Sequence, residues 1–476
     1  MIILYTLFAY FLVLLLISHV TGGKADNRTF FNGNRRSPWY MVAFGMVGAS
    51  ISGVTFVSVP GMVLTADMTY IQTCLGFILG YFAVAFVLLP VYYRLRLTSI
   101  YTYLDYRLGR SAYRTGASFF ILSKLTGSAV RFYVVCAILQ RFVLDAFGVP
   151  FAVTVVAMVG LIWLYTRRGG IRTLVWTDTF QTLCMFAALI LIIYNVARHL
   201  GMTMGEAADL VASDSRSRVF VFDDWMTRQN FWKQFLSGIF IVIVMTGLDQ
   251  DMMQKNLTCK SLREAQKDMC TYGFAFVPAN LLFLSLGVLL VALASKAGDE
   301  LLPMFAATGR MGMTVVVLFT VGVVASSFSS ADSALTALTT SCCVDIWSRP
   351  DDEQLRRKVH LGMSVAFVVF ILLFHSLNST SVIDAIYVLC SYTYGPLLGL
   401  FAYGLLTRRG VSGRMVPVIA VASPLVCFVA DSLSKQLTGY VFGYELLMLN
   451  GLLTFAGLWM TGKRHAGRCS RNRAEV

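Results

Sequence analysis

Apolar residues are gathered into thirteen long stretches along the chain, and polar residues are concentrated in the connections between them. A helix needs about 20 apolar residues to cross the hydrocarbon core of a bilayer, and each stretch has roughly that length or more. The stretches cover residues 1–20, 38–63, 70–93, 115–147, 150–166, 173–197, 231–254, 271–295, 312–346, 359–376, 381–406, 414–432 and 441–461. The pattern predicts an all-α polytopic membrane protein with about 13 transmembrane helices and no soluble domain.

The composition agrees with a chain that lies mostly in lipid. Of its 476 residues, 57% are hydrophobic and 13% are charged, whereas a soluble chain carries about 25% charged residues. Its ten cysteines show no CxxC spacing and its five histidines form no cluster in the sequence. Neither a disulfide framework nor a zinc site is indicated.

The basic residues indicate how the chain is oriented in a cytoplasmic membrane. With the N-terminus outside and the C-terminus inside, 28 of the 39 Lys and Arg residues fall in cytoplasmic connections or the C-terminal tail. That count places Lys255 in a cytoplasmic connection. The net charge of +14 is therefore read as an orientation signal, and no nucleic-acid partner is expected. The first stretch lacks a basic leader and an A-x-A site, so it is expected to stay as an extra N-terminal helix.

The class of protein is narrowed by sequence motifs that are missing. The sequence has no Walker A loop, which argues against an ATP-driven pump, and no repeated pore loop, which argues against a channel. Many spans with polar interruptions favour a secondary transporter. The alternative is a polytopic membrane sensor or enzyme; because no His, Asp and Glu cluster marks one membrane face, no enzymatic activity is expected. The sequence leaves the oligomeric state open.

One predicted membrane helix carries an unusual number of hydroxyl groups. In ASSFSSADSALTALTTSCCVDIW (325–347), small and hydroxyl side chains fall on one arc of a helical wheel, and Asp332 lies just off its edge. The arc contains Ser326, Ser329, Ser330, Ser333, Thr336, Ala337, Thr340 and Ser341. A packing ridge of small residues would account for most of them. The adjacent Ser329 and Ser330 would also suit half of the oxygen shell of a hard cation.

The second stretch has the composition of a broken helix. GMVGASISGVTFVSVPG (45–61) holds several glycines, three serines and Pro60, which make a continuous helix costly. A break at this depth would free backbone carbonyls for an ion at mid-membrane. The alternative is a helix that is merely kinked and closely packed by its glycines.

Four segments resemble the sodium:solute symporter family. They are GASISGVTFVSVPG (48–61), GGIRTLVWTDTFQ (169–181), residues 325–347 and, more weakly, LDQDMMQKNLTCKSLREAQK (248–267). The resemblance covers nearly the whole chain and implies a single transporter domain, 1–476, with a leucine-transporter-type core of two inverted five-helix repeats. Those repeats would be residues 38–197 and 231–406, preceded by the extra helix 1–20 and followed by two C-terminal helices at 414–461.

The resemblance also implies a sodium site between the broken helix and the hydroxyl-rich helix. Its ligands would be the backbone carbonyls of Gly48, Ile51 and Ser326 and the hydroxyls of Ser329 and Ser330. Sodium is therefore the expected coupling ion, with one or two ions bound.

Asp178 is the other candidate sodium ligand. It lies about one and a half turns inside the cytoplasmic end of stretch 173–197, where an unpaired carboxylate is costly. The resemblance places it on the sodium release path or in a second sodium site. The alternative is a salt bridge to Arg172 or to another base at the cytoplasmic end.

The solute site is predicted around an intramembrane arginine. Lys124, Ser128 and Arg131 share one face of the fourth stretch, and Arg131 cannot lose its charge. It either pairs with a protein carboxylate or contacts an anionic substrate. The candidate substrate-binding residues are Ser50, Ser52, Thr55, Gln72 and Arg131. Hydroxyls with an arginine favour a carboxylate, sugar acid or amino acid as the small organic solute, over a neutral hexose.

Overall fold

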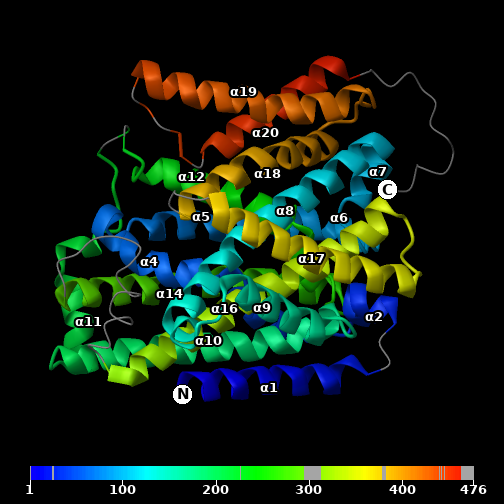
Figure 1. The fold of residues 1–476 in the computed structure, drawn as a ribbon. Coiled ribbons are helices and arrows are strands. Elements are labelled where there is room, and N and C mark those ends of the chain that lie inside the picture. Colours follow the sequence, from blue (N-terminus) through cyan, green and yellow to red (C-terminus); the bar gives the residue numbers. More distant parts are fainter. Residues whose placement is uncertain are drawn as a thin grey trace.

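The computed structural model describes residues 2–23, 26–223, 225, 227–293, 312–377, 382–438, 440, 442–443 and 445–462. Regular structure in these residues is helical, apart from one isolated bridge between Ser37 and Cys259. The long helices lie side by side across the molecule, with α1 at one edge and α19 and α20 at the opposite edge (Figure 1). The helices of the first half are α1 Ile2–Gly22, α2 Asn27–Asn32, α3 Trp39–Ser50, α4 Gly53–Ala66, α5 Tyr70–Ala83, α6 Leu89–Arg94, α7 Thr102–Leu108, α8 Arg110–Leu139, α9 Phe151–Thr166, α10 Ile171–His199 and α11 Met204–Ser213. Those of the second half are α12 Phe231–Val242, α13 Gln250–Asn256, α14 Leu262–Leu293, α16 Gly312–Ser341, α17 Glu353–Leu377, α18 Val382–Leu406, α19 Met415–Thr438 and α20 Glu445–Thr461.

Within the described residues, every predicted apolar stretch coincides with one helix or with consecutive helices; residues 1, 294–295, 381, 441 and 444 of these stretches lie outside the described ranges. In the described part of the chain, eight helices are long and apolar enough to cross a membrane, and the number rises to ten if each of two bent pairs is one span. Two shorter apolar helices, α9 and α20, add to these. The all-helical class is confirmed for the described residues, whereas the count of thirteen crossings stays a prediction.

The predicted break in the second stretch is present. Helices α3 and α4 meet at an angle of 63°, and the residues between them, Ile51 and Ser52, have non-helical backbone angles. Pro60 lies inside α4 and not at the break. The glycine and serine content therefore marks the break more accurately than the proline does.

A second break was not expected from the sequence. The stretch 231–254 contains α12, which runs on through a π-helical turn, and α13, and the two parts are bent by 71°. Asp249 caps α13 by accepting a hydrogen bond from the backbone amide of Asp251 at 2.8 Å. The protein thus contains two broken helices, and at each break some backbone amide and carbonyl groups have no hydrogen-bond partner within a regular helix.

The hydroxyl-rich helix α16 lies at the centre of the bundle. It packs against α3, α4, α8, α10 and α13, and its residues from Val323 to Ser329 are all buried. Helix α1 packs on α10 and α16, and α20 packs on α18 and α19. The core therefore surrounds α16, and α1 lies at the opposite edge of the molecule from α19 and α20 (Figure 1).

Candidate functional site

Two glycines let the broken helix pass between α10 and α16. A Cβ atom on Gly48 would lie 1.8 Å from the Thr182 hydroxyl of α10, and one on Gly53 would lie 2.0 Å from the Ser327 hydroxyl of α16. Real Cβ atoms essentially never come this close to another atom, so a larger residue at either position would force the neighbouring side chain or helix to shift. The break at Ile51 is thereby held within reach of both neighbouring helices.

The hydroxyl of Ser330 joins α16 to the end of α3. It donates a hydrogen bond to the Ala49 carbonyl at 2.7 Å, and it also lies 3.2 Å from the carbonyl of Ser326 on its own helix. The structure thus brings together two of the predicted oxygens, the Ser330 hydroxyl and the Ser326 carbonyl. The α3 carbonyl in contact with them belongs to Ala49, which lies between the predicted Gly48 and Ile51.

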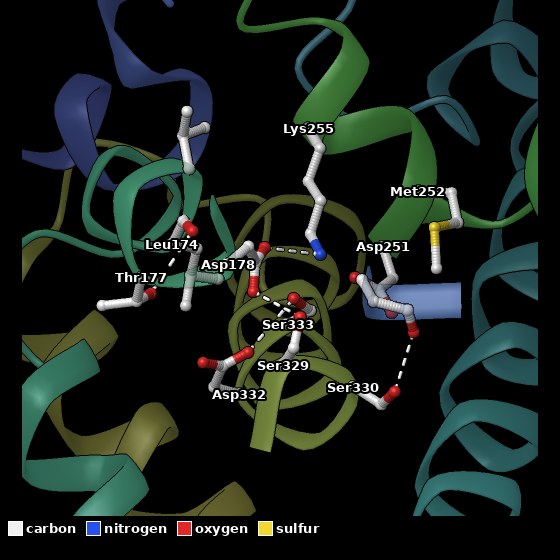
Figure 2. Close-up of polar contacts among 12 residues, drawn as sticks. Leu174, Thr177, Asp178, Asp251, Met252, Lys255, Ser329, Ser330, Asp332 and Ser333 are labelled. Carbon is white, nitrogen blue, oxygen red and sulfur yellow. Dashed lines mark hydrogen bonds and ion pairs between the residues drawn. The ribbon is translucent and has the colours of Figure 1, made fainter. Parts of the chain in front are cut away.

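The hydroxyl of Ser329 points to a different partner. It donates to one carboxylate oxygen of Asp178, on α10, at 2.6 Å. The other carboxylate oxygen of Asp178 lies 2.8 Å from the ammonium nitrogen of Lys255, on α13, as Figure 2 shows. Asp178 and Lys255 are both about 1% exposed, so the ion pair is fully removed from water.

The position of Lys255 corrects two expectations from the sequence. It does not lie in a cytoplasmic connection, because the 71° bend turns α13 into the bundle and buries all seven of its residues. The base that pairs with Asp178 is therefore Lys255 and not Arg172. Asp178 thus forms a salt bridge, but with a buried base from the second broken helix and not with Arg172 or another base at the cytoplasmic end.

A second carboxylate lies on α16 close to this pair. One oxygen of Asp332 accepts a hydrogen bond from the Tyr165 hydroxyl at 2.6 Å, and the other lies 3.2 Å from the Ser333 hydroxyl. Figure 2 shows Asp332 and Ser333 on the same part of α16 as Ser329. This part of the core is consequently rich in oxygen atoms and holds more acidic than basic groups.

A cavity of about 160 Å³ lies beside the breaks of both bent helices. Four of the five predicted solute-binding residues line it, namely Ser50, Ser52, Thr55 and Arg131. Gln72 does not: its amide nitrogen donates to the Gln229 carbonyl at 2.9 Å, and its amide oxygen accepts from the Val221 amide at 3.1 Å. Gln72 thus ties α5 to the segment before α12, and the structure assigns it no place at the cavity.

The two cations on α8 differ in their surroundings. Lys124 forms ion pairs with Asp249 at 3.1 Å and with Asp251 at 2.6 Å. Lys124 is thus paired with protein carboxylates. Within the described ranges Arg131 has no such partner, although it lines the cavity and is partly exposed there.

Several site residues were missed by reading the sequence. The cavity wall includes Asp249, whose carboxylate also accepts from the Tyr394 hydroxyl at 2.7 Å, and Tyr272, whose hydroxyl bonds to that of Ser50. The sequence did contain a signal for one group of them. LDQDMMQK places Asp249, Asp251 and Lys255 within and just after an apolar stretch, where charged side chains face the bundle interior.

Comparison with known proteins agrees with this geometry. The family model for the sodium:solute symporter family matches residues 30–419. The human sodium/iodide cotransporter is 26% identical over 248 residues, which are 52% of this chain and 38% of that protein. The sodium/sialic acid symporter SiaT of Proteus mirabilis is 24% identical over 470 residues, covering 92% of this chain and 90% of that protein.

A solved structure shares the fold. The substrate-bound outward-open state of a Na⁺-coupled sialic acid symporter superposes with a TM-score of 0.81 at 20% identity, covering 98% of this chain and 99% of that one. At this identity the likeness establishes the fold alone. The family model, however, extends over more than three quarters of the sequence and includes both broken helices and α16. The chain therefore belongs to the sodium:solute symporter family.

Proposed function

We propose that this chain imports a small organic anion or zwitterion together with sodium, by alternating access of the central cavity to the two sides of a membrane. Sodium-coupled symport of a small organic solute follows from family membership. The assignment of the ion and the solute to particular residues is our proposal.

The sodium site lies where α16 meets the end of α3. The observation that carries this assignment is the Ser330 hydroxyl, which contacts the Ala49 carbonyl at the break and the Ser326 carbonyl on α16. Hard monovalent cations bind several such oxygens, and a helix break supplies carbonyls that have no backbone partner. We assign the remaining ligands to the carbonyls of Gly48 and Ile51 and to the hydroxyl of Ser329.

Asp178 would then support the site without being its centre. Because the Ser329 proton is donated to Asp178, the lone pairs of the Ser329 oxygen are left for the ion. We therefore assign to Asp178 the orientation of Ser329.

Solute binding is assigned to the cavity beside Arg131. Its polar groups include Ser50, Ser52 and Thr55, and its volume is below the roughly 300–1,000 Å³ of pockets for drug-sized ligands. An unpaired guanidinium favours a solute with a carboxylate, which it can bind through two parallel hydrogen bonds. The names of the relatives, which refer to iodide and to sialic acid, agree with an anionic solute.

The membrane arrangement is part of the same proposal. We place the inverted repeats at 38–197 and 231–406, the N-terminus outside and the C-terminus inside a cytoplasmic membrane. With Lys255 removed from the count, 27 of the 39 basic residues still fall on the cytoplasmic side. The distribution of positive charge therefore supports this orientation without that residue.

Transport in proteoliposomes tests the proposed function. Purified protein would be reconstituted, and uptake of labelled monocarboxylates, sugar acids, amino acids and hexoses would be measured under an inward sodium gradient. A membrane potential of 100 mV contributes about 2.3 kcal/mol per charge and a tenfold gradient about 1.4 kcal/mol. We expect an acidic or zwitterionic solute to accumulate unchanged. Equal uptake in sodium-free buffer with a proton gradient, or chemical conversion of the solute, would contradict the proposal.

A further inference from the structure

Lys255 is surrounded by acidic groups in the centre of the molecule. Its ammonium group pairs with Asp178 at 2.8 Å, and Asp332 on α16 lies close by, as does Asp251 on α13, which itself pairs with Lys124 at 2.6 Å (Figure 2). All three carboxylates and Lys255 itself are at most 2% exposed. Such a cluster needs positive charge, because isolated carboxylates are costly to bury.

The oxygen atoms around Asp178 would suit a second alkali cation. They come from the Asp178 carboxylate, from the Ser329 hydroxyl that donates to it, and from Asp332 and Ser333 one turn further along α16. A lysine ammonium carries the same charge as sodium, and as the end of a side chain it cannot diffuse away. Lys255 reaches this cluster only because the break after Gly247 turns α13 inward.

We propose that the ammonium group of Lys255 is the permanent cation of this cluster and takes the place of a second sodium ion, so that the protein binds one sodium ion in each transport cycle. This inference rests on the proposed sodium site between α3 and α16 and adds its ion count. A second monovalent cation about 4 Å from the ammonium would bind roughly a thousandfold more weakly, at an effective dielectric constant of about 20.

The ion pair also connects three helices around Asp178. It joins α13, which follows the second break, to α10, while Asp178 receives the Ser329 proton from α16. The cation that neutralises Asp178 therefore belongs to the protein and is present at every stage of the cycle. Only the site at Ser330 exchanges its ion with the solution.

Equilibrium binding of ²²Na⁺ to the purified protein tests the proposal without knowledge of the solute. Wild type is expected to bind one sodium ion per chain with a Hill coefficient near one. Lys255→Gln removes the built-in cation and should bind two, with a Hill coefficient above one. Lys255→Arg keeps the charge and should bind one. The double variant Lys255→Gln/Asp178→Asn removes both charges and should return to one ion.

The outcomes separate this inference from the proposed function. Two sodium ions on wild type would overturn the inference, and so would a folded Lys255→Gln variant that binds only one. If Lys255→Gln does not fold, the wild-type count decides: one ion supports the inference and two overturn it. Absence of any saturable sodium binding to wild type would instead refute the proposed sodium site at Ser330.

Discussion

Replacing Ser330 with alanine tests the sodium site most directly. The change removes one hydroxyl and leaves a small side chain that packs in the same space on α16. In the structure that hydroxyl links the Ser326 carbonyl to the Ala49 carbonyl at 3.2 and 2.7 Å. The variant therefore loses one proposed sodium ligand and one hydrogen bond between α16 and α3.

The two losses differ in size. A hydrogen bond between neutral groups contributes about 1 kcal/mol to stability, so thermal unfolding without sodium should change by only a few degrees. An interaction with a charged group is worth roughly 1.5–3 kcal/mol. Since about 1.4 kcal/mol corresponds to a factor of ten, the half-saturating sodium concentration should rise by roughly ten- to a hundredfold.

The assay is initial solute uptake at a series of sodium concentrations, with Ser326→Ala as the matched control. The Ser326 hydroxyl bonds to the Val323 carbonyl of its own helix at 3.1 Å, and its proposed contribution to the ion is its backbone carbonyl. The control should therefore keep wild-type sodium dependence. If Ser330→Ala also keeps it, the hydroxyl is only a packing group and the proposed site is wrong.

Three further predictions concern the solute, the packing and a surface helix. Arg131→Lys keeps the charge but loses the two-pronged contact, so it should raise the half-saturating solute concentration. Arg131→Gln should abolish solute uptake and leave ²²Na⁺ binding intact. Normal uptake by Arg131→Gln would refute contact between Arg131 and the solute. Gly287→Ala should destabilise the folded protein by about 1–3 kcal/mol, because the new Cβ would lie 2.2 Å from a backbone carbonyl of α4. Gly160 has open space around it, so Gly160→Ala should not destabilise the protein. The two variants are compared by thermal unfolding. Hydrogen bonds from the backbone amide and hydroxyl of Thr203 lower the pKa of Glu206, so this cap of α11 is present above that pKa and lost as pH falls through it. Hydrogen-exchange protection of α11, corrected for the intrinsic exchange rate, should therefore fall in acid, and Glu206→Gln should remove this pH dependence.

The sequence by itself determined the class of the protein and the position of the first helix break. Long apolar stretches have one stable arrangement in lipid, because a helix satisfies its own backbone hydrogen bonds, so the positions of the helices could be predicted. The break near Ser50 was predictable because glycine and serine weaken a helix locally. That Ser326, Ser329 and Ser330 lie close together on one helix was predictable from helical periodicity, although their hydroxyls bond to three different partners.

Only the tertiary structure decided which charges meet. The break before α13 depends on its surroundings, where Asp249 caps the helix and also pairs with Lys124, so its local sequence resembled a continuous span followed by a basic connection. That bend moved Lys255 from the expected surface into the core beside Asp178. Gln72 lies away from the cavity for a similar reason, since its hydrogen-bonding partners come from a segment about 150 residues away. Contacts between residues that are distant in sequence depend on how the helices pack, and the residue pattern within one helix does not predict them.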